Sequence, residues 1–398
     1  MRILIPTVTA GAGHLQAASA IEEAWRALRP ADTLEKMDVL DFTPRLYKKI
    51  YVKGYLQLVK HAPEVYAMVF KKTDNPARLK KLARLRRTFA RITTQPFVKS
   101  ILKFQPDAVI CPHYLPLEIL GGIKAKRRRG PAPLVVCVVT DFEAHALWME
   151  PCVGLYCVAT EETKARLIAR GAPSEHVVVT GIPIAAKFAA RPPVAALQRH
   201  YRLRQGITTL LVLGGGFGLG PVEEILSELD KVEKPVQTLV VCGRNEKLRK
   251  KLAAQPRRQP THLLGFADNM HELMAASDLI LTKPGGLTTS ESLALGKPLI
   301  ILNPIPGQEA ANSDFLLERG AAIKINRVED LPFRLGQLIG AQKLGDMARA
   351  AKHLGRPNAA QDICLAVLQR LAPDRVASST GALQHPAFTG VRGHRLPI

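Results

Sequence analysis

The sequence predicts an α/β protein built from two consecutive sets of alternating strands and helices. Each set opens in the same way, with a short apolar run, a glycine-rich turn and then a helix. The first opening covers residues 3–28 and the second covers residues 208–229. Short apolar runs alternating with helices are typical of parallel strands buried on both faces. At 398 residues, the chain is long enough for about two domains.

The order of these segments divides the chain. We expect an N-terminal domain at residues 1–190 and a C-terminal domain at residues 205–372, separated by the linker Arg191-Pro192-Pro193. Residues 373–398 lack periodicity, and we expect a mobile tail there. Strands are expected at residues 3–8, 107–111, 134–139, 155–159 and 177–180, and then at 208–213, 239–242, 263–266, 278–283 and 299–302.

The composition argues against several classes of protein. No apolar stretch reaches the roughly 18 residues that a membrane-spanning helix needs. The chain enters a strand at once, so a cleaved signal peptide is not expected. Its six cysteines are scattered without a Cys-x-x-Cys pair, which argues against a zinc site or a disulfide framework. We therefore expect a cytoplasmic protein in a reducing compartment.

The charge is strongly positive and unevenly distributed. The formal net charge is +22, which favours an anionic partner or surface. A basic insert at residues 44–104 carries sixteen Lys or Arg against two acids, Glu64 and Asp74. Within it, residues 78–91 have apolar side chains at helical spacing and bases on the other sides, as in helices that lie on anionic membranes. The alternative is a solvated helix whose leucines face the core.

Residues 278–304 form the most informative stretch, one complete strand–helix–strand unit. Pro284-Gly285-Gly286 opens onto a helix start that Thr288, Thr289 or Ser290 can cap, and free backbone amides there attract phosphate. Glu291 has two interpretations. Together with Thr288 it forms a capping-box pattern, or its carboxylate accepts both hydroxyls of a ribose.

Two further groups of residues lie where open α/β sheets place chemistry. His14 follows the turn Gly11-Ala12-Gly13 after the first strand, and either an incidental or a functional histidine fits this position. The turn is not Gly-x-Gly-x-x-Gly, and no clear second strand ends in an acid at the dinucleotide spacing, so NAD binding is weakly supported. The second group, 140–148, contains Asp141, His145 and Trp148 at the end of a strand.

These motifs together resemble a known family. The chain is similar to membrane-associated GT-B glycosyltransferases of the monogalactosyldiacylglycerol synthase and processive diacylglycerol glucosyltransferase family. It is more distantly similar to the enzyme that adds N-acetylglucosamine to the lipid-linked peptidoglycan precursor. The matching segments, in family order, are GAGH (11–14), VVTDFEAHALW (138–148), VTGIPI (179–184), LVLGGGFG (211–218) and the long segment 265–300.

The resemblance implies two Rossmann-like domains facing across a cleft, with a nucleotide sugar in the C-terminal one. Glu291 would take the ribose hydroxyls, Phe266 would lie by the base, and Gln308 and Glu309 would lie near the sugar hydroxyls. The two glycine loops would line the diphosphate. The other donor positions are Gly215, Gly216, Phe217, Arg244, Gly285, Gly286 and Thr288.

On the acceptor side, His14 and Asp141 are the candidates for acid–base work, although Asp141 can also be a strand-end carboxylate that caps a turn. The acceptor and membrane positions are Gly13, His145, Trp148, Lys80, Lys81, Arg84, Arg86 and Arg87.

The implied reaction is an inverting transfer of a hexose from a UDP-sugar to diacylglycerol or a glycosyl-diacylglycerol at the inner face of a membrane. A base must deprotonate the acceptor hydroxyl, and helix N-termini would offset charge on the leaving diphosphate. The sequence has no Asp-x-Asp motif, so no metal and no other cofactor are expected.

Three alternatives remain open. One is transfer of N-acetylglucosamine to another lipid. Another is a UDP-N-acetylglucosamine 2-epimerase, which has no need of the basic insert. The third, without enzymatic activity, is nucleic-acid binding, because a pI near 10.0 suits a phosphate backbone. We expect no nucleic acid, because the basic segment carries leucines and tyrosines and contains no recognised nucleic-acid module.

Overall fold

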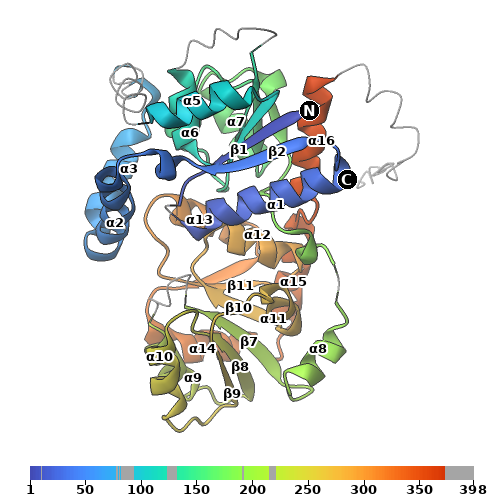
Figure 1. Ribbon diagram of the computed structural model, residues 1–398. Coiled ribbons are helices and arrows are strands. Elements are labelled where there is room, and N and C mark those ends of the chain that lie inside the picture. Colours follow the sequence, from blue (N-terminus) through green and yellow to red (C-terminus); the bar gives the residue numbers. More distant parts are fainter. Residues whose placement is uncertain are drawn as a thin grey trace, which may run out of the picture.

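The computed structural model describes residues 1–9, 11–77, 79, 81, 94–122, 132–190, 192–214 and 221–372, with residues 52, 53, 55, 56, 59 and 60 described by backbone alone. It contains two six-stranded sheets, and the strands within each are parallel (Figure 1). The α/β prediction is confirmed. The expected tail, 373–398, lies outside the described residues.

The first sheet has the order β2-β1-β3-β4-β5-β6, and the second has the order β12-β11-β10-β7-β8-β9. The strands of the first are β1 (Arg2–Thr7), β2 (Thr33–Asp38), β3 (Ala108–Cys111), β4 (Leu134–Val138), β5 (Leu155–Val158) and β6 (Val177–Val179). Those of the second are β7 (Thr208–Leu213), β8 (Val236–Val241), β9 (Thr261–Leu264), β10 (Leu279–Thr282), β11 (Leu299–Leu302) and β12 (Ala322–Ile325).

Helices connect the strands and cover both faces of each sheet. In the first half they are α1 (Ala12–Leu28), α2 (Arg45–His61), α3 (Pro63–Thr73), α5 (Gln95–Phe104), α6 (Tyr114–Gly121) and α7 (Glu161–Ala169). They continue with α8 (Val194–His200), α9 (Val222–Leu229), α10 (Glu246–Ala253), α11 (Met270–Ala276) and α12 (Gly286–Ala294). The last are α13 (Gln308–Glu318), α14 (Leu331–Leu338), α15 (Gln342–Leu354) and α16 (Ala359–Leu371).

The side-chain alternation of the strands explains the two-sided cores. In β1, Ile3 and Ile5 pack with α1 and α16 on one face, whereas Leu4 packs with α5 and α6 on the other. Helix α16 follows the second sheet in the chain, yet it packs on α1 and returns to the first sheet (Figure 1). The end of the expected second domain, 205–372, therefore contributes to the first core.

Two edge strands were not predicted from the sequence, β2 and β12. Both lie at sheet edges, and β2 (TLEKMD) alternates polar and apolar residues instead of forming an apolar run. Strand β2 does end in an acid, Asp38, contrary to our expectation of no clear second strand with an acidic end. The Asp38 carboxylate accepts hydrogen bonds from the Thr9 hydroxyl and, at 2.9 Å, from the Leu40 amide. It thus fixes the segment after β1.

The helices α2 and α3 form an arm beside the meeting point of the two halves (Figure 1). Asp74, just beyond α3, accepts two 2.8 Å hydrogen bonds from the Arg170 guanidinium and one of 2.7 Å from the Ala146 amide. These bonds tie the end of the arm to the first half. Within the described ranges, no helix is long and apolar enough to cross a membrane.

Candidate active site

The glycine segment before α12 lies against the end of β4. Helix α12 begins at Gly286, directly after the last residues of the loop that follows β10. A Cβ on Gly286 would lie 2.0 Å from the Thr140 carbonyl oxygen, so only glycine allows this approach. Gly13, in the first turn of α1, lies against Leu287 of the same helix. The carboxyl ends of the two sheets therefore meet at the start of α12.

The start of α12 carries no side-chain cap, and the capping-box interpretation of Glu291 is wrong. The N-cap residue is Gly285, so Thr288 lies inside the first turn, and Thr289 and Ser290 follow it within the helix. A capping box would require Thr288 itself at the N-cap. The Ser290 hydroxyl instead donates to the Gly286 carbonyl at 2.9 Å. The first amides of a helix have no partner within it and can bind an anion.

Glu291 is a buried carboxyl group. Its residue is 8% exposed, and none of the described residues donates a hydrogen bond to it. Burial raises the pKa of Glu291 to about 8, opposed by the positive charge of Lys187. A buried carboxyl without a hydrogen-bond donor is costly, so this site is suited to a ligand that brings hydroxyl groups.

Lys187 is a residue that the sequence reasoning missed. It follows the matching segment 179–184, and its ammonium group donates to the Asp268 carbonyl at 2.8 Å. Burial lowers the pKa of His271, and the positive charge of Lys187 lowers it further. The same charge opposes the rise in the pKa of Glu291. A single lysine in a chain this basic gives no local signal, and only its position across the interface makes it notable.

His14 lies in the first turn of α1 with a defined tautomer. Its Nδ1 is 2.9 Å from the Pro112 carbonyl oxygen and 3.2 Å from the Thr140 hydroxyl. Because a carbonyl can only accept, Nδ1 carries the proton and Nε2 keeps its lone pair. Burial lowers the pKa of His14, with the Pro112 bond opposing. The neutral ring, packed edge-on against His113 at 4.6 Å, can accept a proton.

Asp141 follows β4 and is held by a residue of the other half. The Asn312 amide donates to the Asp141 carboxylate at 3.2 Å and to the Pro284 carbonyl at 2.9 Å, and it accepts the Phe142 amide at 2.9 Å. Burial raises the pKa of Asp141 to about 6, opposed by the Asn312 bond. Among the described residues no backbone amide bonds to Asp141, so the turn-capping alternative is not supported.

Asn312 itself was missed by sequence reasoning. It is fully buried within α13, and its amide bonds both to the loop after β10 and to the segment after β4. The sequence gives no local signal for this asparagine, because its burial is visible only in the structure and its partners come from distant parts of the chain.

Gln308 and Glu309 start α13. The Glu309 carboxylate accepts the Ile305 amide at 2.7 Å, and burial raises the pKa of this carboxyl group. The Gln308 Oε1 atom accepts the Tyr66 hydroxyl of α3 at 2.7 Å. Both side chains therefore lie at the same meeting point as Gly285, where an added Cβ would lie 4.0 Å from a Glu309 oxygen.

The remaining expected residues lie in other surroundings. Phe266 is 67% exposed, with the Arg244 guanidinium 5.1 Å from its ring centre. Trp148 is buried, and both ring nitrogens of His145 contact backbone groups, the Phe70 carbonyl of α3 and the Leu147 amide. Lys81 is exposed. Outside the described residues lie Gly215, Gly216, Phe217, Lys80, Arg84, Arg86 and Arg87.

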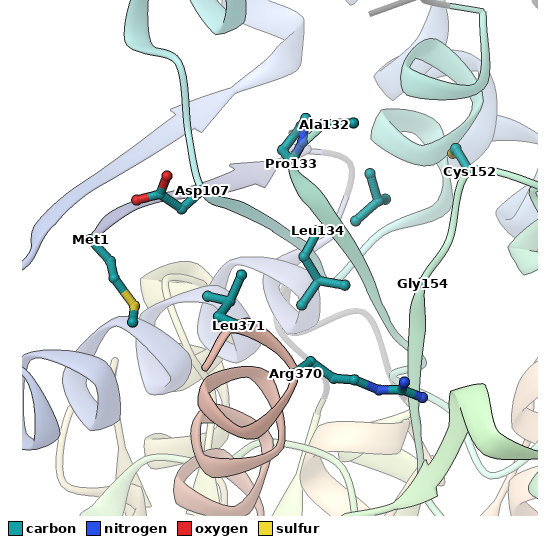
Figure 2. Close-up of a pocket in the computed structure, with 10 residues that line it drawn as sticks. Met1, Asp107, Ala132, Pro133, Leu134, Cys152, Gly154, Arg370 and Leu371 are labelled. Carbon is teal, nitrogen blue, oxygen red and sulfur yellow. The ribbon is translucent and has the colours of Figure 1, made fainter. Parts of the chain in front are cut away.

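A separate cavity of about 500 Å³ lies at the amino ends of the strands of the first sheet, away from the carboxyl ends where the candidate site lies (Figure 2). It is lined by residues at the amino ends of strands, including Met1, Asp107 and Leu134. The Asp107 carboxylate there is bonded to the Arg2 amide at 2.8 Å. Open α/β sheets bind ligands at the carboxyl ends, and none of the residues expected from the sequence lines this cavity.

The described residues form no cluster of metal-binding groups where the two sheets meet. In the part of the chain that the structure describes, no three His, Cys, Asp or Glu side chains are grouped as metal ligands would be. All six cysteines are free thiols. Among the described residues, the site offers a neutral imidazole, one buried and two partly buried carboxyl groups, and the start of a helix.

Comparisons with known proteins identify this arrangement. Residues 14–184 match the model of monogalactosyldiacylglycerol (MGDG) synthase, and residues 209–363 match the glycosyltransferase family 28 C-terminal domain. The processive diacylglycerol beta-glucosyltransferase of Bacillus thuringiensis (strain Al Hakam) is 31% identical over 396 residues, which cover 96% of this chain and 97% of the relative.

Solved structures share the fold at low sequence identity. MurG of Acinetobacter baumannii has a TM-score of 0.58 at 17% identity, over 92% of this chain and 99% of that one. Anabaena HepE in complex with UDP has a TM-score of 0.53 at 14% identity, over 95% and 100%. The GT-B expectation and the family resemblance are both confirmed. The chain belongs to the glycosyltransferase family that includes monogalactosyldiacylglycerol synthase and the processive diacylglycerol glucosyltransferases.

Proposed function

We propose that this glycosyltransferase moves a hexose from a UDP-sugar to the free hydroxyl of diacylglycerol, or of a glycosyl-diacylglycerol, with inversion at the anomeric carbon. The acceptor is supported by the name of the 31% identical relative, and UDP by the HepE complex of the same fold. The observation that carries the proposal is the buried Glu291 carboxyl, without a hydrogen-bond donor among the described residues and one turn into α12.

The donor would bind at the carboxyl end of the second sheet. Glu291 accepts the two ribose hydroxyls, which supply the hydrogen bonds that its carboxylate lacks. The diphosphate lies at the start of α12, where Gly286 and Thr288 offer backbone amides. The Gly285 amide donates to the Lys283 carbonyl at 2.9 Å, so this glycine contributes a close approach of the backbone to the ligand and no free amide. Phe266 and Arg244 lie beside the base. Gly215, Gly216 and Phe217, which lie outside the described residues, are expected to bind the diphosphate from the resemblance alone. Gln308 and Glu309 take the sugar hydroxyls.

His14 is the proposed general base. As the acceptor hydroxyl attacks the anomeric carbon, its proton passes to the His14 Nε2 atom, while the bond from that carbon to the diphosphate oxygen breaks. The Pro112 carbonyl holds Nδ1 protonated, which leaves Nε2 as the free lone pair. Asp141, with a pKa of about 6, is largely ionised at neutral pH, and it is the second candidate for this role.

The leaving UDP gains negative charge in the transition state. The amides and the dipole at the start of α12 would stabilise that charge without a divalent metal. The sequence also lacks an Asp-x-Asp motif, the carboxylate pair that would hold a metal against a diphosphate.

The arm formed by α2 and α3 offers a surface for a membrane. Its exposed apolar side chains lie among exposed bases, a combination that suits an anionic lipid interface. The exposed apolar residues are Leu46, Ile50, Val65, Met68 and Val69, and the exposed bases are Arg45, Lys49, Lys71 and Lys72. We call these nine residues the arm surface. Leu79 is buried, so this leucine faces the protein core.

A donor screen tests the proposal. Purified protein is mixed with diacylglycerol vesicles and each UDP-hexose or UDP-N-acetylglucosamine in turn, and the glycolipid is measured by mass. Transfer of hexose to lipid is expected. Glycolipid from UDP-N-acetylglucosamine alone would favour the other transferase alternative, and epimerised donor without lipid product would favour the epimerase. Vesicle flotation against DNA retention separates lipid from nucleic-acid binding.

A further inference from the structure

Helix α3 joins the arm surface to the donor side of the site. The Tyr66 hydroxyl donates to the Gln308 Oε1 atom at 2.7 Å. One turn along the same helix, the Phe70 ring lies against Gly307, where an added Cβ would meet ring atoms at 2.9 Å. Gly307 has a φ of +96°, so the turn that presents Gln308 is shaped by glycine and covered by an aromatic ring.

The position of α3 is fixed independently of this contact. Asp74 receives the two bonds from Arg170 and the bond from the Ala146 amide, and the His145 ring contacts the Phe70 carbonyl at 3.0 Å. Because the His145 Nδ1 atom accepts the Leu147 amide, its Nε2 atom carries the proton and donates to that carbonyl. Tyr66 is therefore presented by a helix anchored to the first half.

In the structure the Tyr66 hydroxyl donates to the acceptor end of the Gln308 amide and holds the side chain in one rotamer. A glutamine amide offers one acceptor end and one donor end, and the two exchange when the group rotates by half a turn. With Oε1 bonded to Tyr66, the amide nitrogen is the end left for a ligand. A fixed donor discriminates between hydroxyls that differ in direction, whereas a rotating amide accommodates either arrangement.

We propose that Tyr66 is a positioning residue, contributed by the acceptor-side arm, that orients the Gln308 amide and so sets the preference of the enzyme between hexose epimers. This inference rests on the proposed placement of the donor sugar at Gln308. A residue of the acceptor half thereby controls how the donor sugar is recognised.

The test is a double-mutant cycle with Tyr66→Phe, Gln308→Ala and the combination, assayed with UDP-glucose and UDP-galactose and diacylglycerol vesicles. Tyr66→Phe should raise the KM for the preferred donor roughly five-fold and narrow the preference between the two donors, with inhibition by UDP unchanged. In the Gln308→Ala background the same change should have no effect, because Tyr66 acts through that amide.

The control is Tyr156→Phe, which removes another buried hydroxyl, bonded at 3.3 Å to the Glu150 carbonyl within the first half. Its donor preference should match the wild type. An unchanged preference in Tyr66→Phe, or an equal effect with and without Gln308, would overturn the inference. If Gln308→Ala itself leaves the donor KM unchanged, the proposed placement of the donor sugar fails, and the inference fails with it. A strong effect of Gln308→Ala beside a silent Tyr66→Phe defeats the inference alone.

Discussion

Replacing Glu291 by glutamine should weaken UDP binding and, at the same time, stabilise the free protein. The substitution keeps the volume and removes a buried carboxyl that can ionise when the ribose binds. Two charge-assisted bonds to ribose hydroxyls become weaker, which costs about 1–3 kcal/mol, or roughly 5- to 150-fold in Kd. Titration calorimetry with UDP measures this directly.

The stability effect has the opposite sign and depends on pH. The pKa of Glu291 is about 8 in the folded protein, against 4.5 for an ordinary glutamate. Between these values the folded state binds more protons than the unfolded state, so stability falls as pH rises through this window. At pH 7 the loss is on the order of 3 kcal/mol. Glu291→Gln should remove that slope, so its gain in Tm over the wild type grows from pH 5 to pH 8.

The number of protons released when UDP binds is a third measurement that tests the role of Glu291. The ribose hydroxyls favour the ionised carboxylate, so UDP binding at pH 7 should release protons from wild-type protein. Calorimetry in two buffers of different ionisation enthalpy detects this, and Glu291→Gln should lose it. Unchanged UDP affinity together with lowered thermal stability would refute the reasoning, because it would assign Glu291 a purely structural role.

The remaining predictions concern the base, the metal and the arm. His14→Ala should lower kcat by about 10²–10⁴-fold with UDP affinity retained, and a loss of UDP binding would contradict this. With donor and acceptor saturating, wild-type kcat should fall only at pH values below the ordinary histidine pKa, because burial lowers the pKa of His14. Transfer should persist in excess chelator, and restoration by magnesium after its loss would refute the metal-free account. Changing Leu46, Ile50 and Met68 to serine should reduce sedimentation with anionic vesicles while UDP binding is unchanged; full sedimentation of this variant would place the membrane contact elsewhere.

The sequence predicted most of the fold because the central strands are short apolar runs bounded by glycine or proline. Strand β11 was placed at its observed bounds, and β10 within one residue at each end. The edge strand β2 was missed for a physical reason: an edge strand can be covered less completely, so its sequence need not be continuously apolar. The edge strand β12 is largely buried, and its short sequence AIKI was missed without such a reason. The helix start at Gly286 was placed too late, because serine and threonine residues are the usual caps and here the cap position is a glycine.

The sequence predicted those site residues that belong to a short local motif. His14, Asp141 and Glu291 each follow a strand or a glycine turn, and such positions are visible in one sequence. Asn312, Lys187 and Tyr66 could not be found this way. Each of them acts on a residue of the other half. Asn312 bonds to Asp141, the charge of Lys187 acts on Glu291, and Tyr66 bonds to Gln308. Contacts between halves leave no periodicity in either segment.

The distribution of charge connects the membrane and the donor in one scheme. The chain as a whole carries +22, yet near the start of α12 Glu291 is buried and Asp141 and Glu309 are partly buried, and this burial raises the pKa of all three. Carboxyl groups suit the hydroxyls of ribose and hexose, whereas the diphosphate needs donors, which the helix start provides without side chains. The bases are then left for the outside of the molecule, where an anionic lipid surface would attract them under the proposed function. Under the proposed function, carboxyl groups inside the site would recognise the neutral sugar of an anionic donor, while bases on the outside would hold the protein at the lipid surface.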